Sequence, residues 1–223
     1  MIKTFLVEVQ ALRAFAVICV FLFHLDIELF EGGFLGVDIF FAITGYLITK
    51  SIFENKESIL NFYIKRIKRV LPALIVLIFL CYIFVTLFFH PVHSDHFYNS
   101  IYYTSSFISN FYFWVESQNY FSIKSYNQPL LHTWSLSLEV QFYLTFPIIF
   151  FILNKITNNK KIIFLIISLL ISLILAYMFI GREQSFYLLP YRFCEFACGS
   201  ICFFLKKNKN EKINDYISII AFT

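Results

Sequence analysis

Charged residues are scarce in this chain. Lys, Arg, Asp and Glu make up 14% of the 223 residues, whereas a soluble domain has roughly 25%. Hydrophobic residues make up 59%, and Phe alone occurs 31 times. This composition excludes a soluble domain and predicts a polytopic α-helical membrane protein. The net charge of +4 comes from short basic segments between apolar runs, a pattern that indicates membrane topology and no nucleic-acid partner.

The sequence also lacks a disulfide framework, because all five cysteines fall in apolar segments. It lacks a secretory cleavage site, since Arg13 interrupts the first apolar run and no small-x-small sequence follows it. No internal repeat or soluble domain breaks the pattern. Residues 1–223 are therefore expected to form a single membrane-embedded domain.

Apolar runs long enough to cross a bilayer core of roughly 30 Å predict an all-α transmembrane bundle. We expect about six complete spans and a partial seventh that begins near residue 213, which indicates a domain incomplete at its C-terminus. The six spans are expected near 7–27, 34–53, 71–90, 130–153, 162–181 and 186–205.

Residues 91–129 are rich in aromatic residues and Ser. If this segment does not cross the membrane, the lysine and arginine clusters all fall on the cytoplasmic side, as the positive-inside rule requires. We therefore place 91–129 on the extracytoplasmic face as an interfacial or re-entrant segment. The same count places the N-terminus in the cytoplasm.

Arg13 and His24 lie at the two ends of the first apolar run. At 1.5 Å per residue they are roughly 16 Å apart, so both fall inside the membrane, and eleven steps of about 100° place them on one helical face. Ionisable groups there usually mark a reaction or transport path. The alternative is an Arg13 that reaches the cytoplasmic headgroups and a His24 at the outer interface.

Two carboxylates accompany this pair. Asp38 follows a glycine-rich turn that is expected to bring it to the depth of His24, where it would fix the imidazole tautomer; alternatively, it caps its helix. Glu139 lies in an apolar span, where it needs a cationic partner or a proton-transfer task. A polar stripe at helical spacing surrounds it: His132, Ser135, Glu139 and Tyr143. Interhelical hydrogen bonding is the structural alternative for Ser135 and Tyr143.

Arg66 and Arg69 share a helical face in a basic cluster, and Pro72 is expected to open the third span. Such a cluster can clamp the phosphates of a cytosolic ligand, or anchor the chain to anionic lipid. Near the C-terminus, Arg192 and Glu195 are spaced to pair with each other. Neither the cysteines of that helix nor the histidines of 90–96 have the spacing of a metal site, so no metal is expected.

Five ordered segments together resemble the bacterial acyltransferase-3 family of multi-pass membrane O-acyltransferases. They are LRAFAVICVFLFH, GGFLGVDIFFAITGYLIT, the RxxRxxP of 66–72, HTWSLSLEVQFY and PYRFCEFACG. The resemblance runs from about residue 8 to 205. The sequence departs from the family at Val140, where a second glutamate usually follows the first, and the family's membrane domain has more helices than this chain.

The resemblance implies transfer of an acyl group, most commonly acetyl, from acyl-CoA to a hydroxyl of lipopolysaccharide, exopolysaccharide or peptidoglycan, at the bacterial cytoplasmic membrane. His24 would be the essential residue, and Arg13, Arg66 and Arg69 would contact the acyl-CoA donor. His24, oriented by Asp38 or Glu139, would act as general base or carry the acyl group. His132, Ser135, Arg192 and Glu195 are expected to support this site. No bound cofactor is expected; acyl-CoA is a substrate.

The residues also fit two other functional hypotheses. The same intramembrane groups suit a proton-coupled transporter, although no pair of interrupted spans related by symmetry is present. The second hypothesis is that the chain is a catalytically inactive fragment of a split acyltransferase.

Overall fold

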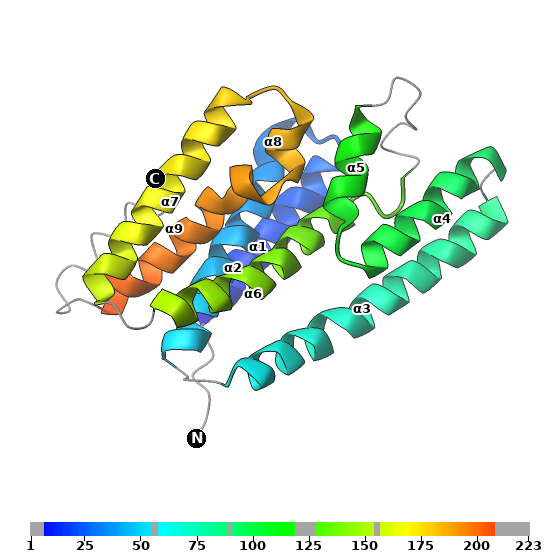
Figure 1. Ribbon diagram of the computed structural model, residues 1–223. Coiled ribbons are helices and arrows are strands. Elements are labelled where there is room, and N and C mark those ends of the chain that lie inside the picture. Colours follow the sequence, from blue (N-terminus) through cyan, green and yellow to red (C-terminus); the bar gives the residue numbers. More distant parts are fainter. Residues whose placement is uncertain (1–6, 55–57, 89–90, 119–127, 154–156, 208–223) are drawn as a thin grey trace. The chain divides into compact units, whose positions relative to one another are not determined.

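The computed structural model describes residues 7–54, 58–88, 91–118, 128–153 and 157–207. Within these ranges every regular element is a helix and no strand is present, which confirms the all-α prediction (Figure 1). The elements are α1 (Val7–Phe23), η1 (Glu28–Leu35), α2 (Gly36–Phe53), α3 (Ile59–Phe88), α4 (Pro91–Ser105), α5 (Ser109–Ser117), α6 (Thr133–Leu153), α7 (Asn158–Met178), α8 (Glu183–Tyr187) and α9 (Leu189–Lys207).

Four helical stretches in the described part of the chain are long and apolar enough to cross a membrane: Glu28–Phe53, Ile59–Phe88, Lys160–Met178 and Glu183–Leu205. They overlap four of the six expected spans. Helices α1, with 17 residues, and α6 correspond to the other two. The chain is thus a helical membrane protein, while the number of spans stays a prediction. The partial seventh span lies outside the described residues.

The prediction that Pro72 opens the third span is wrong, because α3 begins at Ile59 and carries Pro72 in its interior. Proline lacks the N–H that would bond to the carbonyl of residue 68, but membrane helices tolerate this loss more readily than soluble ones. The basic cluster with Arg66 and Arg69 therefore belongs to the same continuous helix as the apolar span.

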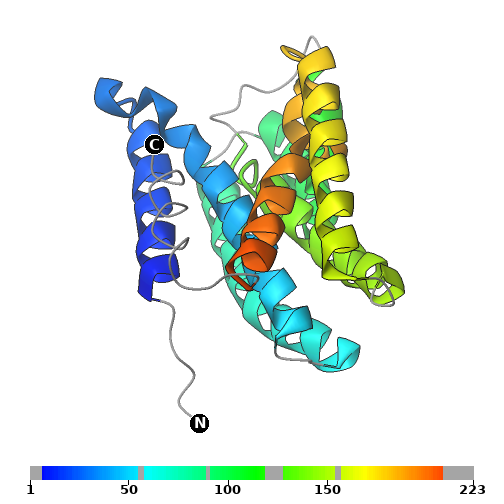
Figure 2. The same ribbon diagram turned by 90° about the vertical axis from the view of Figure 1, so that its left-hand side faces the viewer.

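The chain divides into two compact units. The first contains α1, η1, α2, the part of α7 up to Ile171 and the part of α9 from Phe193. Here α2 and α9 lie side by side (Figure 2) and approach closely through the small residues Gly45 and Gly199. The rings of Phe41 and Phe196 stack with centroids 4.6 Å apart. The Ser200 hydroxyl donates to the Gly45 carbonyl at 3.3 Å, which ties the same two helices together.

The reversal between α1 and α2 is built differently from the expected glycine turn. Asp26 takes the left-handed conformation, with φ of 54°, which Asp tolerates better than most residues. Gly33 and Gly36 instead allow η1 and α2 to approach α1: a Cβ at Gly33 would collide with the carbonyl oxygen of Cys19, and one at Gly36 would lie 2.5 Å from that of Ala16.

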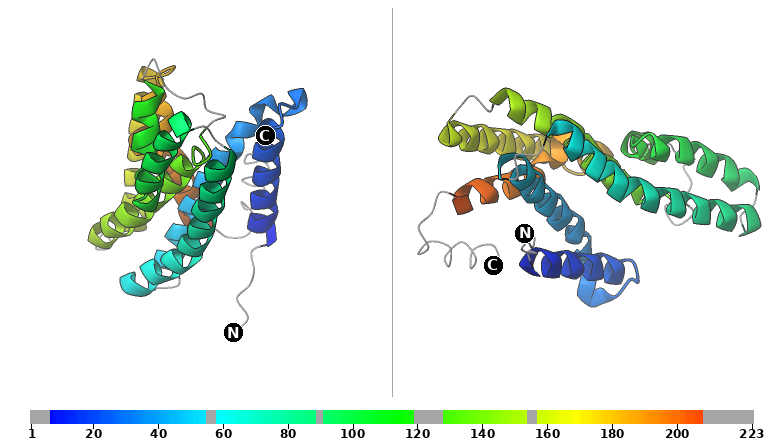
Figure 3. Two further views of the ribbon diagram at one scale, coloured as in Figure 1. Left: turned by 90° about the vertical axis from the view of Figure 1, so that its right-hand side faces the viewer. Right: turned by 90° about the horizontal axis from the view of Figure 1, so that it is seen from below.

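The second unit contains α3 to α6, α8, the end of α7 and the start of α9. Helices α3 and α4 run side by side (Figures 1 and 3), with the rings of Tyr82 and Tyr98 6.0 Å apart. Helix α5 packs against α6 and α8, and the buried Asn110 side chain donates to the Tyr187 carbonyl at 3.1 Å. The described residues 91–118 of the expected segment 91–129 thus contain two helices, α4 and α5. The side of the membrane on which they lie stays a prediction.

Candidate active site

His24 follows the last residue of α1. Its Nδ1 lies 2.7 Å from the carbonyl oxygen of Val20, and its backbone N–H donates to the same oxygen at 3.2 Å. A carbonyl can only accept, so Nδ1 carries a proton, and in the neutral ring Nε2 is then the basic nitrogen. The Phe23 ring meets the imidazole edge to face, with centroids 5.2 Å apart. The backbone of α1 therefore fixes the tautomer of the neutral ring, in which Nε2 is the nitrogen that can accept a proton.

Arg13 lies on the same helix, which is continuous from Arg13 to the His24 amide. The predicted separation of roughly 16 Å along one face is consistent with this backbone. Asp38 lies in the first turn of α2. Because Gly36 packs against Ala16 and Val20, that turn adjoins the α1 segment whose carbonyl holds His24. The predicted pairing of Asp38 with His24 stays a prediction.

Arg66 and Arg69 belong to the second unit, and their side chains behave differently. The Arg66 guanidinium folds back on its own helix, donating to the Phe62 carbonyl at 3.2 Å and lying 3.7 Å from the centre of the Phe62 ring. Arg69 reaches α6 instead, where its Nη2 donates to the Tyr143 hydroxyl at 2.8 Å. Arg69 is thus held by a side chain of another helix.

Glu139 receives a hydrogen bond from the same tyrosine: Tyr143 Oη donates to Glu139 Oε2 at 3.0 Å. Arg69 and Glu139 thus bond to the same phenol from different helices. Whether Glu139 serves as the partner of a cation or in proton transfer stays a prediction. Tyr143 is 3% exposed. Sequence reasoning placed Tyr143 on the stripe of Glu139 but left its role open, because the α3 partner is remote in the sequence.

The four predicted supporting residues have the following contacts. His132 is exposed and precedes α6, and its carbonyl accepts from the Ser135 hydroxyl at 3.1 Å, which is a local bond at the start of a helix. The Arg192 guanidinium lies 5.8 Å from the centre of the Phe186 ring. Glu195 accepts from the Cys194 thiol at 3.2 Å. The pairing of Arg192 with Glu195 stays a prediction.

A buried polar network joins α4, α5 and α6, and sequence reasoning missed it. The Ser109 and Ser137 hydroxyls are 2.8 Å apart, and the Thr133 hydroxyl lies 3.1 Å from those of Ser109 and Thr104. All four side chains are buried. The abundance of Ser and Thr in these segments was the only signal, and it did not indicate which residues would meet. Such contacts join helices where lipid supplies no hydrophobic driving force.

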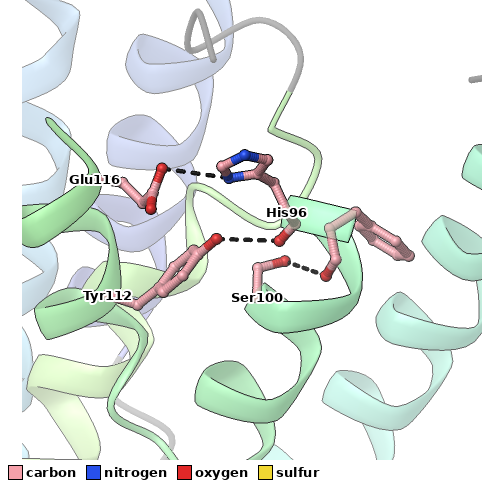
Figure 4. Close-up of polar contacts among 5 residues, drawn as sticks. His96, Ser100, Tyr112 and Glu116 are labelled. Atoms are coloured by element: carbon pink, nitrogen blue, oxygen red, sulfur yellow. Dashed lines mark hydrogen bonds and ion pairs between the residues drawn. The ribbon is translucent and has the colours of Figure 1, made fainter. Parts of the chain in front are cut away.

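His96, one of the histidines considered for a metal, pairs with α5 instead (Figure 4). Its Nδ1 lies 3.4 Å from Glu116 Oε2, and its carbonyl accepts from the Tyr112 hydroxyl at 3.1 Å. Burial, followed by the charge of Glu116 and by Tyr103, raises the pKa of Tyr112 to about 12. No cluster of three His, Cys, Asp or Glu suited to a metal occurs among the residues that the structure describes, and His90 lies outside them.

The apolar helices of the described residues define a multi-pass membrane protein. Residues 6–223 match the family model described as an acyltransferase domain, and the chain belongs to this acyltransferase-3 family. The predicted resemblance is confirmed.

Curated relatives carry related names. The chain is 34% identical over 170 residues to peptidoglycan O-acetyltransferase OatA of Listeria monocytogenes, covering 74% of this chain and 27% of the relative. It is 34% identical over 189 residues to O-acetyltransferase OatA of Staphylococcus aureus, covering 81% and 31%. The chain thus spans less than a third of the length of these relatives. No solved structure matches it.

Proposed function

We propose that this chain is the membrane acyltransferase part of an O-acetyltransferase that moves acetyl from cytosolic acetyl-CoA to a hydroxyl of an extracytoplasmic glycan. Family membership supports acyl transfer, and the relatives' names support acetyl as the group. Among the glycans considered, the name of the Listeria relative favours peptidoglycan. The proposal includes the cytoplasmic membrane as the location and a cytoplasmic N-terminus.

The observation that carries this proposal is the bond between His24 Nδ1 and the Val20 carbonyl. It makes Nε2 the proton acceptor of the neutral ring. Nε2 takes the proton of the acceptor hydroxyl as its oxygen attacks the thioester carbonyl carbon. The carbon–sulfur bond then breaks, and the CoA thiolate takes the proton back from the imidazolium. The products are an O-acetyl ester, free CoA and a neutral His24.

Charged side chains assist both the catalytic histidine and the binding of the donor in this proposal. Asp38, on the turn that adjoins α1, stabilises the imidazolium that forms during attack. Arg13, three helical turns before His24, binds the donor on the approach to the thioester, and its distance suits an extended pantetheine arm. Arg66 and Arg69 bind phosphates, since a guanidinium fork matches phosphate oxygens.

The test measures label transferred from radiolabelled acetyl-CoA to peptidoglycan in membranes that carry the chain, from a host without its own O-acetyltransferase. His24→Ala should abolish alkali-labile label. His24→Asn is the sharper variant, because its amide N–H still donates to the Val20 carbonyl but offers no base. We expect it to lose transfer by about a hundredfold or more, as for a general base.

Insertion of both variants is checked by extraction with detergent and gel filtration. Wild-type transfer by His24→Asn would contradict the base assignment. Label in neither wild type nor variants would contradict the proposed activity of this chain.

A further inference from the structure

Tyr143 stands between a cation and an anion that come from different helices. Arg69 of α3 donates to its oxygen at 2.8 Å, and Tyr143 donates to Glu139 of α6 at 3.0 Å. A guanidinium has no acceptor and a phenol has one hydrogen, so the direction of both bonds is fixed. The positive charge, the O–H dipole and the carboxylate therefore form one aligned series.

This arrangement orients Arg69 without neutralising it by direct contact. The partner at 2.8 Å is an uncharged phenol, and the carboxylate acts one bond further away. The Arg69 guanidinium also lies 5.9 Å from the centre of the Tyr143 ring, within the range of a cation–π contact. One bond uses one of the five N–H donors, and the residue is exposed. The fork thus retains charge and donors for a ligand.

The neighbouring residues show that the arrangement is particular to this position. Arg66, on the same face of α3, is held by its own helix at the Phe62 carbonyl. Tyr63 also joins α3 to α6, but its hydroxyl donates to a backbone carbonyl, that of Leu144, at 3.2 Å. The Tyr63 contact thus joins the two helices without a charged group, whereas the Tyr143 contacts join an arginine to a glutamate.

We propose that Tyr143 is a positioning residue that, with Glu139 behind it, holds the Arg69 guanidinium ready for a phosphate of acetyl-CoA. The role rests on the proposed function, because it takes Arg69 as a ligand of the donor. Preorganising a long side chain lowers the entropy lost when a ligand binds. Glu139 then affects donor binding through Tyr143. Neutralising Glu139 should therefore change the affinity for CoA more than it changes kcat.

The experiment compares Tyr143→Phe with Tyr63→Phe in the full chain, reconstituted in lipid nanodiscs at fixed ionic strength. Both variants remove one hydroxyl that joins α3 to α6, but only the first touches the charged groups. CoA binding is measured by titration, and acetyl transfer gives kcat and KM for acetyl-CoA. Tyr143→Phe should weaken CoA binding and raise KM by about tenfold, the usual effect of a hydrogen bond to a charged group. Tyr63→Phe should leave both at wild-type values.

A double-mutant cycle tests the path of the effect. Because Tyr143 acts through Arg69, adding Tyr143→Phe to Arg69→Gln should change the Kd for CoA no further. Equal losses in Tyr143→Phe and Tyr63→Phe, or a loss confined to kcat, would overturn the positioning role. So would additive effects in the cycle.

If Tyr143→Phe does not fold, Glu139→Gln provides the second test, since its amide oxygen still accepts the phenol O–H while the charge is gone. It should weaken CoA binding, and unchanged affinity would overturn the inference. Wild-type protein that neither binds CoA nor transfers acetyl would instead contradict the proposed function itself.

Discussion

The contact between α2 and α9 gives the sharpest prediction for stability. A Cβ at Gly199 would collide with the carbonyl oxygen of Ala42 and lie 2.7 Å from its carbonyl carbon and 2.9 Å from the Tyr46 nitrogen. These are backbone atoms, which have no alternative rotamer. Restoring an ordinary distance of 3.4 Å to the carbon alone requires about 0.7 Å of separation (3.4 minus 2.7), and the nearer oxygen requires more. Gly199→Ala must therefore move two helices apart.

The cost follows from that separation. A gap of 0.5 to 1 Å forfeits roughly a quarter to a half of each dispersion contact, and overpacking typically costs about 1–3 kcal/mol. Because the collision is with backbone atoms, we expect the upper part of this range, about 2–3 kcal/mol. Against this, replacing Gly by Ala inside a helix stabilises the helix by about 1 kcal/mol, because Ala has the higher helix propensity. The net loss is then about 1–2 kcal/mol, which lowers the Tm by about 2–8 °C.

Thermal unfolding of detergent-solubilised protein, followed by gel filtration after heating, measures this effect. Gly32→Ala is the matched control, because a Cβ at Gly32 meets no heavy atom within 4 Å. Gly45→Ala should also destabilise, since its Cβ would collide with the carbonyl oxygen of Phe196. One separation relieves both collisions, so the double variant should lose less than the sum. A Gly199→Ala protein with the same Tm as the Gly32→Ala control would refute this reasoning.

Two further predictions concern α4 to α6. The raised pKa of Tyr112, about 12 against 10 when unfolded, means that the unfolded chain releases this proton first, so folding stability falls between pH 10 and 12. Tyr112→Phe should flatten the fall of Tm over this range, and parallel curves for the two proteins would contradict it. Ser137→Ala should lower stability by about 0.5–2 kcal/mol, because the buried Ser109 hydroxyl and N–H both lose a partner. Ser168→Ala, whose hydroxyl bonds only within α7, is the control and should be neutral in the same thermal assay.

The helices were predictable because a membrane constrains them so strongly. Length and hydropathy are enough to place α2, α3, α7 and α9, since unpaired backbone groups are not tolerated in lipid. The error at Pro72 arose from a rule for soluble helices, where an interior proline is far more costly. The sequence also predicts that glycines form the reversal after α1, because glycine is the usual residue in tight turns. In the structure Asp26 takes the left-handed conformation at this reversal, and Gly33 and Gly36 allow close packing.

For the candidate site, the sequence predicts which residues share a face of the same helix. The spacing of Arg13 and His24, and of Glu139 and Tyr143, follows from helical periodicity alone. What holds each group was not predictable. His24 is oriented by a carbonyl of its own helix, which has no side-chain signature, and Arg69 meets Tyr143 across 74 positions of sequence. Contacts at that distance depend on tertiary packing, which periodicity does not encode.

Lipid changes which residues specify the packing of such a chain. Ile75, Phe79 and Leu87 of α3 are exposed, and an apolar side chain loses little by facing lipid rather than another helix. Apolar residues therefore set how far a helix extends but not which helix it meets. Gly199, which allows the backbone of another helix to approach, and Tyr143, whose buried hydroxyl requires hydrogen-bond partners, can each be satisfied by only a few arrangements. The small and polar residues consequently determine both the packing of α2 on α9 and the orientation of Arg69.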